Sequence, residues 1–197
     1  AQPIGGAAPA ASATVPAPTP APALALAPNW AARQITAVVT AGLLGTDATS
    51  FRPDDPLTRG ELYEALTVLG KTVSRPATPD RVVTMRELDA QLVGALGLLP
   101  SARRFRVAAR DAGLQPTGML GTETVARLLG LRLNHPQGQD DLELSPNEPA
   151  TRAEAAYSFA RVLQLGPDTI AYVDQLAQGF ARRRGVQVDE VDLWLLG

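Results

Sequence analysis

Residues 53–62 read PDDPLTRGEL, and two later stretches repeat this pattern: residues 79–88 read PDRVVTMREL and residues 146–155 read PNEPATRAEA. Each stretch has Pro, then Asp or Asn, two variable residues, an apolar residue, Thr, two further residues and Glu. Thr followed by Glu three residues later is typical of a capping box, in which each side chain bonds to the other residue's backbone amide. The repeat therefore predicts three helices that start at Thr58, Thr84 and Thr151.

The apolar faces of these three helices also superpose. Residues three or four positions apart lie on one face of a helix, so an apolar set at this spacing predicts a buried face. Three equivalent faces predict a small bundle with the capped helices inside, and we expect Phe51 and Phe159 in its core. The equivalent positions are Leu62, Leu66 and Leu69 in the first helix, Leu88, Leu92 and Ala95 in the second, and Ala155, Phe159 and Val162 in the third.

Other stretches with helical periodicity lie outside the capped helices. We expect outer helices over 30–39, 105–114 and 122–131, and an amphipathic helix after Leu165 that ends near the arginines of 182–184. Alternating β-branched residues are missing apart from 186–188. The predicted fold class is therefore all-α.

The first 28 residues contain 11 Ala, 7 Pro and no charged side chain. This composition favours an extended polyproline II spacer over a packed core. The chain begins at Ala1 without Met, as expected of a secreted protein after removal of its signal, although a trimmed chain would look the same. At the other end, residues 191–196 are apolar enough to need a partner surface.

The composition excludes several functional classes. The 197 residues are 45% hydrophobic with a net charge of −2, and no window approaches 18 unbroken apolar residues. A membrane span is therefore not expected, and the near-neutral charge gives no reason to expect nucleic acid as a partner. Because there is no Cys and only one His, His135, cysteine nucleophiles, disulfides, thiolate metal sites and paired-imidazole sites are excluded. We expect no cofactor and no metal.

Residues 29–69 resemble the S-layer homology modules of bacterial cell-surface proteins, and residues 126–165 give a second match. The matching segments are Trp30-Ala31, AGLLG at 41–45, FRPD at 51–54, LTRGE at 57–61 and TRAE at 151–154. The resemblance implies three modules about a pseudo-threefold axis, with a degenerate middle one. The implied organisation is a spacer (1–28), a three-module domain (29–70, 71–100 and 101–165) and a C-terminal helical extension (166–197).

The resemblance also implies a function at the cell surface. Such modules bind a secondary cell-wall polysaccharide non-covalently, often one that carries pyruvate ketals, in grooves between modules. The arginine that holds the ligand's carboxylate in this family maps to Arg59 and Arg152. In the middle repeat Met85 takes that position, and Arg86, one residue later, is the candidate ligand-binding residue. The expected protein is secreted, attached to the bacterial cell wall, and not an enzyme.

A physical argument also points to these arginines. At the first helical position a cation meets the positive end of the helix dipole, whereas a bound anion there would meet free helix amides and a guanidinium fork. The alternative is a solvated arginine or an ion pair within one module, such as Arg59 with Asp55. Trp30 is a further candidate, because an aromatic ring can stack on a sugar; its alternative role is to anchor the first outer helix.

Several weaker signals remain. Residues 112–124 are similar to small helical peptidoglycan-binding domains. The arginines at 103, 104, 106 and 110 are expected to form a solvated helix face. The loop at 134–141 contains His135 but has no calcium-loop spacing. Two alternative functions stay open: a structural subunit of an S-layer or surface appendage that assembles through its C-terminal segment, and the wall-targeting part of a peptidoglycan hydrolase whose catalytic domain is absent.

Overall fold

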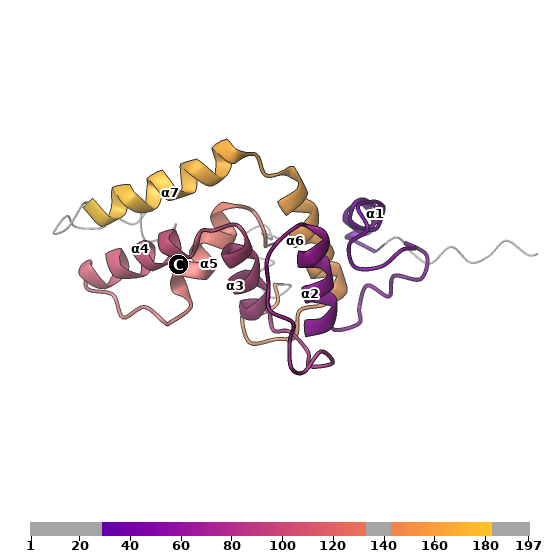
Figure 1. Ribbon diagram of the computed structural model, residues 1–197. Helices are drawn as coiled ribbons and strands as arrows, with labels where there is room; N and C mark the ends of the chain where they lie inside the picture. Colours follow the sequence, from indigo (N-terminus) through magenta and orange to yellow (C-terminus); the bar gives the residue numbers. More distant parts are fainter. Residues whose placement is uncertain (1–28, 133–142, 183–197) are drawn as a thin grey trace, which may run out of the picture.

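The computed structural model describes residues 29–132 and 143–182, and within them the chain forms seven helices and no strand (Figure 1). The predicted all-α class is confirmed. The helices are α1 (Ala32–Thr40), α2 (Arg59–Val68), α3 (Met85–Ala95), α4 (Leu99–Asp111), α5 (Leu120–Leu128), α6 (Arg152–Gln164) and α7 (Pro167–Arg182). The spacer, the His135 loop and residues 191–196 lie outside the described residues.

The three repeat helices begin where their sequence predicts. Thr58, Thr84 and Thr151 are the N-caps of α2, α3 and α6, and each hydroxyl accepts a hydrogen bond from the amide three residues later. In α2 and α3 the glutamate also accepts from the Thr amide, at 2.9 Å and 3.1 Å, which completes the capping box. These bonds satisfy amides that a helix start otherwise leaves open.

The residues just before the three N-caps form a closed ring of backbone hydrogen bonds. The amide of Leu57 donates to Ala150, that of Ala150 donates to Val83, and that of Val83 donates to Leu57, with N···O distances of 2.8, 2.9 and 2.9 Å. All three side chains are fully buried. Each repeat therefore donates to one neighbour and accepts from the other, and the cap segments hold the three helices together.

The first two amides of each inner helix extend this ring. The first amide donates to a carbonyl of the neighbouring repeat, that of the residue two positions before Leu57, Val83 or Ala150. The second amide donates to the carbonyl of the proline that begins that repeat. The proline of the repeat thus supplies a carbonyl that caps the next helix. The pairs are Arg59 to Arg81 and Gly60 to Pro79, Met85 to Glu148 and Arg86 to Pro146, and Arg152 to Asp55 and Ala153 to Pro53, at 2.8–3.0 Å.

Outer helices cover two of the three inner helices. Helix α1 packs against α6, and α5 packs against α3. Among the described residues no outer helix packs against α2 to a similar extent, because the chain from Leu69 to Thr84 contains no helix. The second repeat therefore lacks the outer helix that the first and third repeats have.

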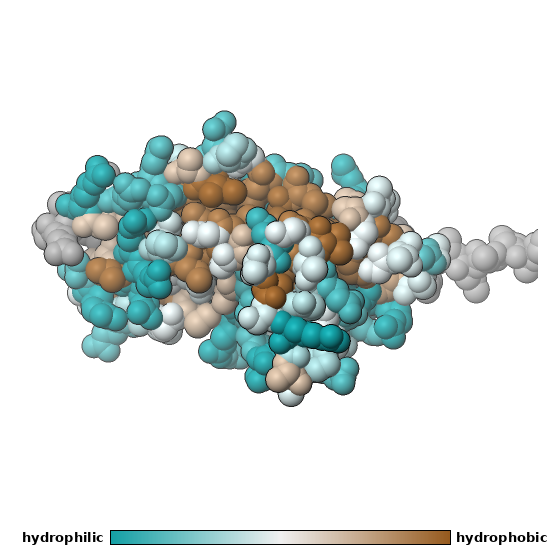
Figure 2. Space-filling model, in the orientation of Figure 1, coloured by the Kyte–Doolittle hydropathy of each residue, from teal (hydrophilic) through white to brown (hydrophobic). Residues whose placement is uncertain are grey.

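A second group of helices extends the fold on the side away from α1 (Figure 1). Helix α4 packs against both α5 and α7, and the rings of Phe105 and Phe180 lie 5.8 Å apart. The expectation of a solvated arginine face on α4 is wrong for Arg104, whose guanidinium lies 2.7 Å from Asp174 on α7. Figure 2 shows hydrophobic surface in the middle of this face and hydrophilic side chains over the α4 end.

The predicted core is confirmed at its central positions. Phe51 and Phe159 are buried, as are the first two apolar positions of each inner helix, whereas Leu69, Ala95 and Val162 are only partly buried. The outer helices α4 and α5 begin six and two residues earlier than expected, at Leu99 and Leu120. Proline is tolerated in the first turn, so Pro100 does not delay the start of α4.

A buried charged cluster joins α3 to α5 and the segments beside it. Arg132 and Asp89 are both almost fully buried, with Arg132 Nε 3.5 Å from Asp89 Oδ2. Glu143 lies 3.3 Å from Arg132 and 2.8 Å from Arg127. Neither carboxylate oxygen of Asp89 accepts a hydrogen bond within the described part of the chain. Burial raises the pKa of Asp89 to about 7, against the opposing charge of Arg132.

Candidate functional site

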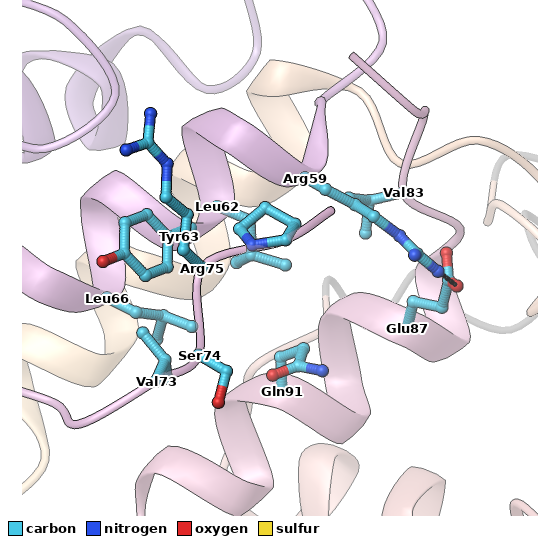
Figure 3. A pocket seen from close by; sticks show the side chains of 11 residues that line it. Arg59, Leu62, Tyr63, Leu66, Val73, Ser74, Arg75, Val83, Glu87 and Gln91 are labelled. Carbon is cyan, nitrogen blue, oxygen red and sulfur yellow. Dashed lines mark hydrogen bonds and ion pairs between the residues drawn. The ribbon is translucent and has the colours of Figure 1, made fainter. Parts of the chain in front are cut away.

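A groove of about 320 Å³ lies between α2 and α3, bordered by residues 73–76 (Figure 3). Its volume is within the usual range of small-ligand pockets. The lining combines an apolar floor with polar and charged side chains. The lining residues are Arg59, Leu62, Tyr63, Leu66, Val73, Ser74, Arg75, Pro76, Val83, Glu87 and Gln91.

The groove exists because the second repeat is short. Within 29–132 and 143–182 no outer helix covers α2 on this side, so Leu62, Tyr63 and Leu66 face a short segment without helix. The residue two positions before the repeat's proline also differs: it is Phe51 in the first repeat, but Ala77 in the second. A methyl side chain at this position cannot stack on Arg59 as the Phe51 ring stacks on Arg152.

Arg59 extends from α2 toward α3 at one end of the groove (Figure 3). Its Nη2 donates to Glu87 Oε1 at 2.6 Å, and its side chain remains 32% exposed. The exposed Arg81 approaches the same oxygen at 3.6 Å. Two arginines and one glutamate leave a net charge of +1 here, which favours an anionic ligand.

Glu87 stays ionised in this arrangement. Burial raises its pKa, but the hydrogen bond from the Thr84 amide and the charges of Arg59 and Arg81 outweigh burial, so the pKa lies below its ordinary value. Because Glu87 occupies only one side of the Arg59 guanidinium, the other N–H groups can meet a second anion. In Figure 3 the Arg75 guanidinium points away from α3, so Arg59 is the labelled cation that faces α3.

Arg152, the equivalent arginine of the third repeat, has a different environment. It is only 7% exposed, and its guanidinium lies 4.6 Å from the centroid of the Phe51 ring. Its Nε donates to the Phe51 carbonyl at 2.8 Å and its Nη2 to the Leu44 carbonyl at 2.6 Å, while Nη1 donates to Glu61. The protein itself therefore uses all three sides of this guanidinium.

The two carbonyls that Arg152 binds belong to an unusual loop. Leu44 and Arg52 have φ angles of 55° and 52°, in the left-handed region that non-glycine residues rarely adopt. Arg152 bonds to the carbonyl of Leu44 and to that of Phe51, which precedes Arg52. We conclude that Arg152 holds the loop of the first repeat in this strained conformation.

Both arginines follow one rule of pairing. Each bonds to the capping glutamate of the neighbouring repeat, Arg59 to Glu87 and Arg152 to Glu61. This pairing explains why an arginine occupies a helix start, where the helix dipole alone disfavours it. At the third equivalent position Met85 is buried. Arg86 is half-buried, and its side chain has no hydrogen bond or ion pair to any residue that the structure describes.

Two expectations about these arginines are wrong. The first-turn amides of α2 and α6 are not free for an anion, because they bond to neighbouring repeats and to the N-cap threonines. Asp55 does not pair with Arg59; it lies 3.1 Å from Arg52, an exposed pair. An anion at Arg59 would therefore be held by the side chain and not by the helix N-terminus.

Trp30, the remaining predicted site residue, lies away from this groove. It is 50% exposed, and its ring centroid is 6.1 Å from that of Tyr157 on α6. The groove itself contains four polar residues that the sequence did not identify: Tyr63, Ser74, Arg75 and Gln91. The short spacing between the first two repeats was the available signal, since it removes the helix that would cover them.

The described residues offer no metal site and no membrane span. Across 29–132 and 143–182, no three His, Asp or Glu side chains gather as a metal would require. Among the same residues, no helix has both the length and the apolarity to cross a bilayer.

Comparison with known protein families gives one match. The S-layer homology domain model matches residues 26–62, which include Trp30, the ring residue Leu57 and Arg59. No curated protein and no solved structure matches the chain. S-layer homology domains generally anchor proteins to the cell wall by binding secondary cell-wall polymers, and they are not catalytic. Residues 26–62 are therefore similar to the S-layer homology domain, a domain of cell-wall and cell-surface proteins.

Proposed function

We propose that this protein anchors itself non-covalently to the bacterial cell wall by binding an anionic secondary cell-wall polysaccharide in the groove between α2 and α3. One observation carries the proposal. Arg59 lies inside the family match and its guanidinium is accessible at the mouth of a groove, whereas Arg152 is enclosed by its own chain.

The chemistry of the groove suits an acidic sugar. Arg59 offers N–H groups that a carboxylate, such as that of a pyruvate ketal, accepts in a charge-assisted hydrogen bond. Ser74 and Gln91 supply uncharged hydrogen-bonding groups along the groove, and Tyr63 supplies an aromatic ring. The arginine near one end and the aromatic and polar groups beyond it match a sugar that is acidic at one substituent only.

The proposed architecture is a three-module domain over 29–165, with modules at 29–70, 71–100 and 101–165. The cyclic hydrogen bonds among Leu57, Val83 and Ala150 support a pseudo-threefold arrangement. The residue at the arginine position then differs among the modules. Arg59 is accessible in the first, Met85 replaces the arginine in the second, and Arg152 is buried in the third. We propose one anion-binding groove and a structural role for Arg152; Arg86, on α3, is not a lining residue of this groove.

The function is tested by sedimentation with purified sacculi before and after the accessory polysaccharide is stripped. The account predicts that the protein sediments with intact sacculi and stays in solution with stripped ones. Equal binding to both would assign the affinity to peptidoglycan, as the resemblance of residues 112–124 suggests. No binding to either would contradict the proposed function.

The assembly alternative requires a free surface in the C-terminal extension. Helix α7 already packs against α4 through Phe180 and Asp174, which reduces that surface. Comparing the full chain with a chain ending at Arg182 by size-exclusion chromatography tests whether the last segment drives association. For the hydrolase alternative, the anchoring role of this chain is the same, and catalysis belongs to another domain.

A further inference from the structure

The outward side of α4 carries a stripe of arginines and aliphatic side chains. A helix turns by about 100° per residue, so positions 99, 103, 106, 107 and 110 fall within about 100° of its circumference. The other side of α4 is buried, and the helix packs against α5 and α7. The outward set, which we call the α4 stripe, consists of Leu99, Arg103, Arg106, Val107 and Arg110.

The α4 stripe is cationic in a chain that is slightly acidic. Helix α4 contains four arginines and one aspartate, whereas the whole chain has a net charge of −2. Arg104, beside the stripe, is paired with Asp174, but Arg103 and Arg110 are exposed. Arg106 donates to a neutral backbone carbonyl at 3.3 Å and so keeps its charge. The stripe itself contains no carboxylate, and it therefore attracts anions.

Aliphatic side chains lie among these arginines and are also exposed. Leu99 is 42% exposed and Val107 is 39% exposed. Residues four positions apart are neighbours on a helix, so Arg103 lies between Leu99 and Val107. A dissolved polyanion would bind the arginines and leave the aliphatic groups in water. The surface of an anionic membrane accommodates both, because phosphates meet the arginines and alkyl groups enter the acyl boundary.

The neighbouring helix adds a cation at the same end of the molecule. Ser101 bonds to Asp174 and the Phe105 ring lies next to that of Phe180, so α4 and α7 run in the same direction (Figure 1). Arg182, the last residue of α7, is exposed and lies toward the C-terminal end of α4. With the three arginines of the stripe it makes a cluster of four, a number typical of segments that bind anionic lipids.

We propose that the α4 stripe docks this protein onto the surface of an anionic lipid membrane. The arginines bond to lipid phosphates, and Leu99 and Val107 enter the boundary between headgroups and acyl chains. A helix of 13 residues is too short to cross a bilayer, so α4 lies in the plane of the headgroups. No residue of the stripe lines the Arg59 groove, so lipid docking and wall anchoring are independent.

The test is cosedimentation of the full chain with lipid vesicles that contain no glycan. Vesicles of equal parts phosphatidylglycerol and phosphatidylcholine should bind the protein, and vesicles of phosphatidylcholine alone should not. Because salt screens exposed charges, raising NaCl from about 0.1 M to about 0.5 M should weaken binding about tenfold or more. A protein that stays in solution with the anionic vesicles would overturn the proposal.

Two double variants separate the charge of the stripe from its aliphatic groups. The arginine variant, Arg103→Gln with Arg110→Gln, should bind anionic vesicles about tenfold or more weaker, since each arginine near such a surface contributes about fivefold. The aliphatic variant, Leu99→Gln with Val107→Gln, keeps every charge and should bind several-fold weaker. All four side chains are exposed, so far-UV circular dichroism should show both variants folded.

A matched control removes two exposed arginines outside the stripe, by Arg33→Gln with Arg52→Gln, and should bind like the wild type. Arg59→Ala should also bind vesicles like the wild type, while sacculi freed of lipid test the Arg59 groove alone; the two proposals therefore fail separately. The lipid proposal is overturned if the arginine variant binds like the matched control. It is also overturned if the aliphatic variant binds like the wild type, because the stripe would then take any polyanion.

Discussion

Replacing Arg152 with alanine should destabilise the fold far more than the same change at Arg59. The two arginines occupy equivalent positions in the repeat, and each bonds to a neighbouring capping glutamate. Only Arg152 is buried, stacked on Phe51 and bonded to two backbone carbonyls. The comparison therefore separates an arginine that maintains the structure from one that is available to a ligand.

The magnitude follows from the groups left without partners. Arg152→Ala removes the donors of two carbonyls and the partner of Glu61. Breaking a buried ion pair from one side costs roughly 3–5 kcal/mol. The loop with positive φ at Leu44 and Arg52 loses its support as well. Arg59→Ala breaks a partly exposed pair, for which less than about 1 kcal/mol is expected.

The assay is urea unfolding followed by far-UV circular dichroism, which reports directly on an all-helical protein. We expect the unfolding free energy of Arg152→Ala to fall by roughly 3–5 kcal/mol. Its Tm should fall by an amount on the order of 10 °C. Arg152→Lys keeps the charge but lacks the planar fork, so an intermediate loss is expected. The reasoning is refuted if Arg152→Ala is destabilised no more than Arg59→Ala.

Four further changes test other parts of the structure. Gly121→Ala should lower the unfolding free energy measured in urea melts by about 1–3 kcal/mol, because a Cβ at this position would overlap the Ala102 carbonyl where α4 meets α5. Thr84→Ala should cost about 1 kcal/mol in the same melts through loss of the N-cap. Because burial raises the Asp89 pKa to about 7, the native state holds this proton more tightly than the unfolded chain, so the unfolding free energy should fall as pH rises from about 4 to about 7. Asp89→Asn should flatten that slope in urea melts across this range. Ala77→Phe should place a ring beside Arg59 as Phe51 lies beside Arg152, and should weaken sedimentation with sacculi without lowering stability.

The positions of the inner helices could be predicted from the sequence because their signals are local. A capping box requires only residues three apart, and the starts at Thr58, Thr84 and Thr151 agree with the structure. The ring of Leu57, Val83 and Ala150 could not be predicted in the same way, because it joins backbone groups from three distant segments. The sequence shows that these positions are equivalent, but not that they bond to one another.

The two arginines show where sequence equivalence stops being informative. Their shared position predicted a shared role, yet the structure encloses Arg152 and leaves Arg59 accessible. The difference depends on neighbours outside the motif: Phe51 and its loop cover one guanidinium, while the short second repeat leaves the other open. The helix amides that were expected to hold an anion also depend on residues outside the motif, because they donate hydrogen bonds to carbonyls of the neighbouring repeats.

The central claim is that Arg59 in the α2–α3 groove holds the wall polymer. Its most direct test is sedimentation of Arg59→Ala with intact sacculi, next to Arg103→Ala, which removes an exposed arginine on α4. Losing a charge-assisted hydrogen bond predicts binding roughly tenfold or more weaker for Arg59→Ala. The control should bind like the wild type, and the unfolding free energy of both variants should equal that of the wild type to within about 1 kcal/mol. Undiminished binding by a folded Arg59→Ala protein would contradict the account.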